Sequence, residues 1–206
     1  RSTLFPYTTL FRSRSNLFRE LLAENGPDKS FIFSPLSLAY VLGMLIDGAR
    51  PGSMTQMQIA KVLHATDATS YYNPSAYKDI FKILIENMPL TDPKVDLGIA
   101  NALFVDKTIT LYGGYADLMA QYYHSDYGIC NFSDRATIDV INDWCYMKTK
   151  GMIPSIIDEI PEEVISYFLN AVYFKAGWLI PFEKKYTNTA PFYKPDGTTT
   201  EGPLMR

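Results

Sequence analysis

Histidine is the side chain that most often serves as the base of a hydrolase, and this sequence offers two candidates, His64 and His124. Such a base must lie beside a nucleophile or a metal, which motifs such as GxSxG or HExxH reveal. Neither histidine lies in a motif of this kind. His64 follows an expected helix, and a cation near a helix C-terminus is mildly stabilising. We therefore expect a structural role for His64, assign no catalytic residue and predict that the chain is not an enzyme.

A metal or cofactor site would need clustered ligands, and the sequence offers one acidic group to consider. It consists of Asp158, Glu159, Glu162 and Glu163. This group lacks the one-three-five spacing and the glycine of a calcium loop, so it reads as a solvated connection. The sequence also lacks a glycine-rich phosphate-binding loop. We therefore predict neither a metal nor a cofactor.

Two further patterns concern covalent modification. Asn131-Phe132-Ser133 matches the N-glycosylation sequon. Because an expected strand covers residues 128–132, we expect this sequon to be unused. Cys130 and Cys145 lack the CxxC spacing of a zinc or redox site, so we expect two free thiols packed in the core.

Asn170 has the most informative surroundings of any polar residue in the chain. It stands in Leu169–Phe174, a nearly continuous run of apolar, β-prone residues. A strand that is apolar on both faces must be covered on both sides, which predicts a place in the interior of a sheet. Burying an unpaired amide costs about 1–3 kcal/mol, so Asn170 needs defined hydrogen-bond partners there.

The elements that must position these residues read as helices first and strands later. Helices are expected at residues 16–24, 35–48, 55–63, 74–88, 115–123 and 136–149. Strands are expected at residues 30–33, 95–105, 128–132, 164–178, 189–193 and 198–205. A helix-rich half followed by a strand-rich half predicts an α+β fold rather than a doubly wound sheet.

Local signals support several of these boundaries. Ser34 is a good N-cap, and Pro35 fits the first helical position after it. The segment Thr55-Gln56-Met57-Gln58 fits a capping box that opens the next helix. Asp134 is expected to cap the helix from residue 136, and Lys194-Pro195-Asp196-Gly197 predicts the turn of a hairpin.

The bulk composition is that of an ordinary globular protein. The chain has 206 residues, 47% of them hydrophobic, and a net charge of -3. Mild acidity gives no case for a nucleic-acid partner, which needs a clustered basic face. No apolar run reaches the ~18 residues that a membrane-spanning helix requires, so no membrane partner is expected. We see no secretory signal at the start of the chain.

Residues 1–13 read differently from the rest. The near-repeat of Thr3-Leu4-Phe5 in Thr9-Leu10-Phe11 resembles a translated sequencing adapter. We therefore predict a non-native segment over residues 1–13 and a single domain over residues 14–206. A disordered natural tail is the alternative for the first segment.

Motifs in a fixed order carry a resemblance to a known family. Phe33-Ser34-Pro35-Leu36-Ser37 comes first, Ile141-Asn142-Asp143-Trp144 follows, then Leu169–Trp178, and finally Gly202-Pro203-Leu204-Met205. Together they resemble the serpins over about residues 16–206. Serpins are large α+β proteins, mostly suicide inhibitors of serine proteases.

The resemblance implies roles for four residues. Ser34, Ser37 and Asn170 match the "shutter", a polar cluster under the centre of the sheet called sheet A. Trp178 matches the "breach", where that sheet first opens. The helix from Pro35 would lie behind sheet A, and the helix from Ala136 would cross its front. The glycine of Phe174–Trp178 comes one place later than in the common family pattern, so the bend there is expected to differ.

The resemblance also implies that the chain is the N-terminal part of a serpin. It stops at Arg206, a little over halfway through the domain, before the reactive-centre loop and the histidine expected to bond Asn170. The partner would be a serine or cysteine protease, engaged through that loop outside the cell. The 206 residues alone are expected to be inactive and poorly soluble.

Two alternatives stay open at this point. A non-inhibitory serpin, a carrier or chaperone, would share every motif above. Likewise, Ser34, Ser37 and Asn170 fit two interpretations equally well: a latch with few stable arrangements, or polar residues that merely satisfy a buried pocket.

Overall fold

The computed structural model describes residues 18–24, 26, 32–63, 74–90, 92–194 and 196–205. Residues 1–13 and half of the strand expected at 30–33, residues 30 and 31, lie outside this part of the chain, and residues 32 and 33 are described but do not belong to a strand. Residues 18–24 are helical. The elements that follow are α2 (Pro35–Gly48), α3 (Met54–Val62), α4 (Pro74–Asn87), η1 (Met88–Leu90), β1 (Val95–Asp106), α5 (Tyr115–Tyr123), β2 (Ser125–Cys130), α6 (Ala136–Lys148), β3 (Ser166–Ala176), η2 (Lys184–Tyr186), β4 (Asn188–Tyr193) and β5 (Thr199–Leu204).

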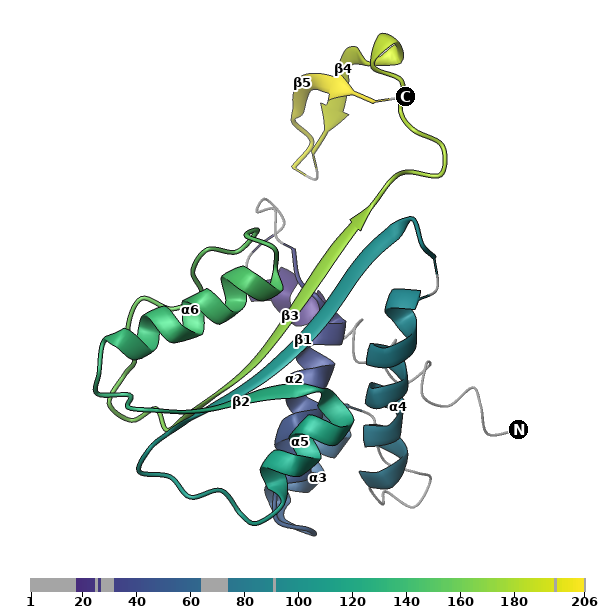
Figure 1. Ribbon diagram of the computed structural model, residues 1–206. Coiled ribbons are helices and arrows are strands. Elements are labelled where there is room, and N and C mark those ends of the chain that lie inside the picture. Colours follow the sequence, from purple (N-terminus) through teal and green to yellow (C-terminus); the bar gives the residue numbers. More distant parts are fainter. Residues whose placement is uncertain are drawn as a thin grey trace.

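The described strands form two sheets (Figure 1). The larger sheet has the order β2-β1-β3, with β2 parallel and β3 antiparallel to β1. The smaller sheet is the antiparallel β4-β5 hairpin, which lies beyond the far end of β3. Two of the three described strand pairings are antiparallel, and α2, α3 and α4 all precede β1, which together confirm the expected α+β class.

The expectation that the strand around Asn170 lies inside a sheet is wrong for the described residues. β3 pairs with β1 alone and forms an edge, while β1 is the central strand. Both faces of β3 are nevertheless packed against other residues, with Phe168 in one apolar cluster and Ala171 in another. The apolar pattern therefore predicted correctly that both faces of this strand are covered. It carries no information on whether another strand pairs with each flank.

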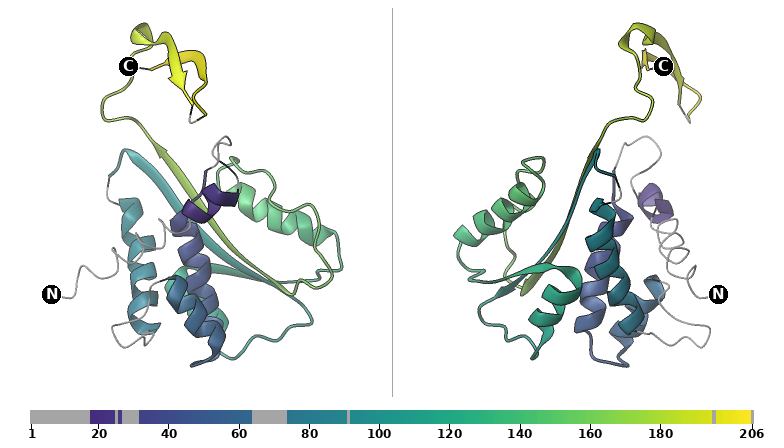
Figure 2. Two further views of the ribbon diagram at one scale, coloured as in Figure 1. Left: turned by 180° about the vertical axis from the view of Figure 1, so that it is seen from behind. Right: turned by 45° about the vertical axis from the view of Figure 1, so that its right-hand side comes forward.

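The three-stranded sheet lies between two helical layers (Figure 2). Helices α2, α4 and α5 pack behind it, where the core includes Tyr40, Phe81 and Leu103. Helix α6 lies on the opposite face, where Trp144 and Ile141 pack against Ala102, Phe104 and Ala171. Alternation along β1 explains this division, because successive side chains of a strand point to opposite faces.

Helix α2 begins at the predicted residue, whereas α3 begins one residue before the predicted cap. Ser34 caps α2 with its side chain, and Pro35 is the first helical residue. The cap of α3 is Ser53, two residues before the predicted Thr55. The Ser53 Oγ accepts from the Gln56 N–H at 3.1 Å, and the Gln56 side chain accepts from the Gly52 N–H at 2.9 Å. Ser53, upstream of the predicted Thr55, thus caps the helix in a variant of the capping box in which the glutamine bonds the residue before the cap.

Strand β2 begins and ends earlier than predicted. His124 adopts a left-handed conformation at the end of α5, with φ of 47°, and turns the chain directly into β2. The strand then covers residues 125–130 instead of 128–132. Consequently Asn131-Phe132-Ser133 lies in a turn, and the premise for an unused sequon is wrong. β3 is also shorter than expected, since it ends at Ala176 and leaves Trp178 outside the sheet.

Candidate functional site

A pair of asparagines lies at the centre of the three-stranded sheet. Asn101 on β1 and Asn170 on β3 are directly opposite in the strand register. The Asn170 Nδ2 donates to the Asn101 Oδ1 at 2.7 Å, and the Asn101 Nδ2 donates to the Tyr123 carbonyl oxygen at 2.6 Å. Asn101 is completely buried. The three residues form one hydrogen-bonded chain from the sheet to the end of α5.

The fold explains why these groups meet. Leu103 and Val105 lie in the core behind the sheet, so Asn101, two residues earlier on the same strand, faces the same side. The carbonyl groups in the last turn of a helix have no partner within that helix. Tyr123 is the last residue of α5, and the Asn101 amide supplies the donor that its carbonyl needs.

One atom of this site is unsatisfied. The Asn170 Oδ1 is buried and accepts no hydrogen bond from any residue that the structure describes. Leaving a buried acceptor unpaired costs about 1–3 kcal/mol, which is a large part of the stability of an ordinary domain. The site is therefore chemically suited to a further donor beside β3.

Ser34 and Ser37 lie together at the start of α2. The Ser34 Oγ accepts from the Ser37 N–H at 3.1 Å, which is the capping bond of the helix. Within the described residues no hydrogen bond joins either serine to Asn170. The structure thus joins Asn170 to Asn101 and Tyr123, and it joins the two serines to each other.

Sequence reasoning did not select Asn101 as a partner of Asn170. Both asparagines stand among small apolar residues, in Ala100-Asn101-Ala102 and in Asn170-Ala171. That shared setting was the available signal, because an amide in a buried strand requires a partner. The Tyr123 carbonyl left no signal, since the side-chain sequence does not reveal which backbone group stays unpaired.

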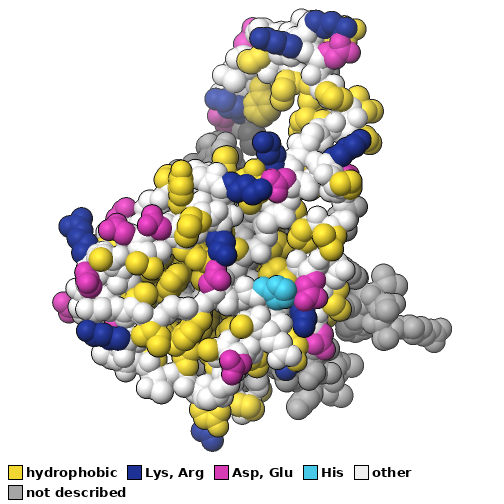
Figure 3. All heavy atoms as spheres, in the orientation of Figure 1, with side chains coloured by type: hydrophobic (Ala, Val, Ile, Leu, Met, Phe, Trp, Pro, Cys, Tyr) yellow, Lys and Arg dark blue, Asp and Glu magenta, His cyan; other side chains and the backbone are white. Residues whose placement is uncertain are grey.

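Trp178 lies two residues beyond β3, and 72% of its surface is exposed. Its ring meets that of Phe182 edge to face, with 5.4 Å between the ring centres. Leu179 and Ile180 beside it are exposed as well. Figure 3 shows hydrophobic side chains over this connection and the hairpin that follows. Several exposed apolar side chains in one short segment are typical of a surface that packs against another part of a protein.

The structure describes one of the two histidines that were considered for catalysis. The His124 Nε2 and the Glu86 Oε1 are 3.1 Å apart on the surface, and His64 lies outside the described residues. Cys130 and Cys145 are free, and burial raises the pKa of both thiols, so neither is activated as a nucleophile. The described part of the chain has no group of three or more His, Cys, Asp or Glu placed to hold a metal ion.

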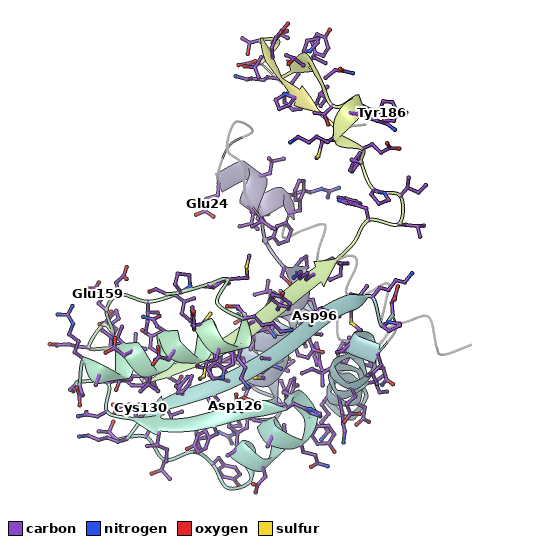
Figure 4. The ribbon with its side chains drawn as sticks, turned by 45° about the horizontal axis from the view of Figure 1, so that its top comes forward. Glu24, Asp96, Asp126, Cys130, Glu159 and Tyr186 are labelled. Atoms are coloured by element: carbon purple, nitrogen blue, oxygen red, sulfur yellow. The ribbon has the colours of Figure 1, made fainter. Side chains whose placement is uncertain are left out.

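Helix α6 is held to the front of the sheet by charged side chains. The Asp126 carboxylate on β2 accepts from the Trp144 Nε1 at 2.7 Å and pairs with the Lys148 Nζ at 2.9 Å. Lys150, just after the helix, pairs with Asp96 on β1. Figure 4 shows these two aspartates on different strands. The end of α6 is therefore attached at two separate points of the sheet.

The pKa of Asp126 reflects this arrangement. Partial burial raises the pKa, but the hydrogen bonds from Lys148 and Trp144 and the charge of Lys148 outweigh it and lower the pKa overall. The Asp126 carboxylate thus stays ionised to a lower pH than an ordinary aspartate does.

Comparison with known proteins identifies the architecture. The sequence model described as "Serpin (serine protease inhibitor)" matches residues 14–206. The plasma serine protease inhibitor of Homo sapiens is 31% identical over 194 residues, which cover 92% of this chain and 46% of that protein. Serpin A3-2 of Bos taurus is 29% identical over 191 residues, which cover 92% of this chain and 45% of that protein.

Solved structures agree with the sequence comparison. The crystal structure of reactive-loop-cleaved human thyroxine-binding globulin has a TM-score of 0.85 and 28% sequence identity to this chain. The match covers 99% of this chain and 60% of the thyroxine-binding globulin chain. The chain spans about half the length of the curated relatives it matches.

Proposed function

The chain belongs to the serpin family, and from that premise we propose that it is the N-terminal part of an inhibitor of serine or cysteine proteases. The observation that carries the proposal is the pairing of β3. Residues of β3 pack into apolar clusters on both faces, yet in the described residues the outer flank of this strand is unpaired. An unpaired edge of this kind is a template for one more strand.

The proposed mechanism uses this edge. The nucleophile of a protease attacks a bond in a reactive-centre loop, which the 206 residues do not contain, and forms an acyl-enzyme. The cleaved loop then adds to the sheet beside β3 and carries the attached protease with it. Distortion of the protease prevents deacylation, and the stored conformational energy of the inhibitor is released. Helix α6 lies across the strands that must adjust.

Ser34, Ser37 and Asn170 are proposed to form the shutter that controls this step. The unpaired Asn170 Oδ1 supports the idea, because a donor from a following segment, expected to be a histidine, would complete the site. In the latch interpretation this bond breaks when the sheet opens. In the alternative interpretation the three residues only satisfy a buried pocket. Trp178 is proposed to lie at the breach, consistent with its position just past β3.

A second candidate is a non-inhibitory carrier. The thyroxine-binding globulin structures support this candidate, because one of them is a complex with thyroxine and both match nearly all of this chain. The two candidates differ in the hinge before the reactive-centre loop, where small residues favour insertion and proline or charged residues oppose it. Reading the coding sequence past Arg206 therefore separates them.

The decisive experiment uses the full-length protein. Mixed with a panel of serine and cysteine proteases, an inhibitor of this type forms a covalent complex that survives denaturing electrophoresis. Cleavage of the loop with no such complex would favour the carrier. The 206-residue chain is expected to form no complex and to aggregate, because the edge of β3 is unpaired. A cooperative, monomeric thermal transition of this chain would contradict the expected aggregation.

We also propose an extracellular location, which the plasma protease inhibitor among the relatives supports. Within the described residues no helix is long and apolar enough to cross a membrane.

A further inference from the structure

The turn between β2 and α6 has a well-defined backbone. The Asp134 N–H donates to the Asn131 carbonyl oxygen at 2.8 Å and closes the turn. The Thr137 Oγ1 donates to the same carbonyl oxygen at 2.7 Å. The Phe132 N–H donates to the Asp106 Oδ2 at 2.8 Å, and the Phe132 ring is buried. Cys130, labelled in Figure 4, is the last strand residue before this turn.

None of these bonds uses the side chain of Asn131 or Ser133. Asn131 is half-buried and Ser133 is exposed, and within the described residues neither side chain makes a hydrogen bond. Phe132 instead supplies the apolar contact of the turn, in the cluster with Trp144 and Ala102. The turn therefore stays intact when the Asn131 amide carries a substituent.

We propose that Asn131 is the acceptor of an N-linked glycan. The residues Asn131-Phe132-Ser133 supply the required amide and hydroxyl two positions apart. The Asn131 Nδ2 would attack the anomeric carbon of a lipid-linked oligosaccharide pyrophosphate. The nitrogen loses a proton, a carbon–nitrogen bond forms, and the lipid pyrophosphate leaves. This inference rests on the proposed extracellular location, because the sugar donor is met only in the secretory pathway.

The sequence itself contains a matched negative site. Asn73-Pro74-Ser75 has the same outer residues, but proline at the middle position excludes it as an acceptor. No other asparagine in the 206 residues is followed two positions later by serine or threonine. One glycan per chain is therefore expected, and peptide mapping must place it at Asn131.

The test is expression of the 206-residue chain behind a cleavable secretion leader in eukaryotic cells. A peptide N-glycosidase should increase gel mobility by one step, and mass spectrometry should find aspartate at position 131 after the digestion. Asn131→Gln and Ser133→Ala should each abolish the step. Ser133→Thr should retain it. Denaturing gels make the result independent of the solubility of the chain.

Ala190→Thr provides the positive control, because it completes a sequon at Asn188 on the exposed strand β4. An enzyme-sensitive step in this variant together with none in the parent chain would overturn the proposal. The readout does not involve a protease, so a glycosylated chain whose full-length form fails to inhibit would refute the proposed function alone.

Discussion

Removal of the Asp126 carboxylate is the perturbation with the clearest structural consequence, because this group holds α6 to β2. Asp126→Ala removes the acceptor of the Trp144 Nε1 and the counter-charge of Lys148 together. Only 6% of Trp144 is exposed, so its indole N–H has little access to water. We expect α6 to detach from the sheet more often in this variant, while the rest of the fold stays intact.

The magnitude has two parts. An unpaired, buried N–H costs about 1–3 kcal/mol. The Lys148 pair is roughly half exposed, with side-chain exposures of 38% and 51%, so it contributes only ~0–1 kcal/mol. We therefore expect a local loss of about 2–3 kcal/mol, which corresponds to roughly 30- to 160-fold faster opening of the helix.

Hydrogen–deuterium exchange of the α6 amides in the full-length protein measures this opening directly. Asp126→Asn retains an acceptor for Trp144 and loses only the ion pair, so its α6 amides should exchange less than about tenfold faster. Asp143→Ala is the matched control, because Asp143 is an exposed aspartate of α6 without a partner in the described residues. Unchanged exchange in Asp126→Ala would show that apolar packing alone holds the helix and would refute this reasoning.

The same attachment should weaken in acid. The pKa of Asp126 is lowered in the folded protein, so its stabilisation is complete above the ordinary range of an aspartate. It is lost as the pH falls through the lowered pKa. The difference in exchange between the parent protein and Asp126→Ala should therefore shrink at low pH.

Three other perturbations test the remaining arguments. In the full-length protein, Asn170→Leu should favour premature sheet opening or polymerisation on warming, and normal inhibition by a stable monomer would count against the latch. Asn101→Leu leaves the Tyr123 carbonyl and the Asn170 amide unpaired, so the free energy of unfolding in urea should fall by about 2–4 kcal/mol; a smaller loss than in Asn170→Leu would contradict the central place of Asn101. Hydrogen bonds from the Thr108 hydroxyl and then from the Phe132 and Thr108 amides lower the pKa of Asp106 to about 2, so the Phe132 amide resonance should titrate near that pH, and titration near pH 4 would argue against this bond.

The sequence was most informative where a local rule decides the structure. Ser34 and Pro35 identified the start of α2, and the range 115–123 was correct for α5. Both depend on residues within one or two turns of a helix. The first residue of β2 was missed because it depends on the left-handed backbone of His124. Positive φ is uncommon for any residue other than glycine, and although histidine is one of the more tolerant residues, a single histidine does not predict it.

The candidate site was harder to predict because its contacts are distant in sequence. Asn170 was selected correctly as a buried amide, but its partner Asn101 lies 69 residues away on another strand. Only the register of β1 and β3 brings the two together. The unpaired flank of β3 was missed for a related reason, since the apolar pattern of a strand reports what covers its faces and is silent about its neighbours.

The bonding pattern of the sheet indicates where it can open. β1 and β3 share an antiparallel ladder that runs from Val95–Ala176 to Val105–Ser166. The asparagine pair links that ladder to the end of α5 through the Tyr123 carbonyl. Separating β1 from β3 would break both the ladder and this link, whereas widening the sheet on the outer flank of β3 breaks neither. Because backbone bonds within a ladder are lost together, an opening that follows the proposed mechanism would leave β2, β1 and β3 joined to one another and to α5, with the added strand beside β3.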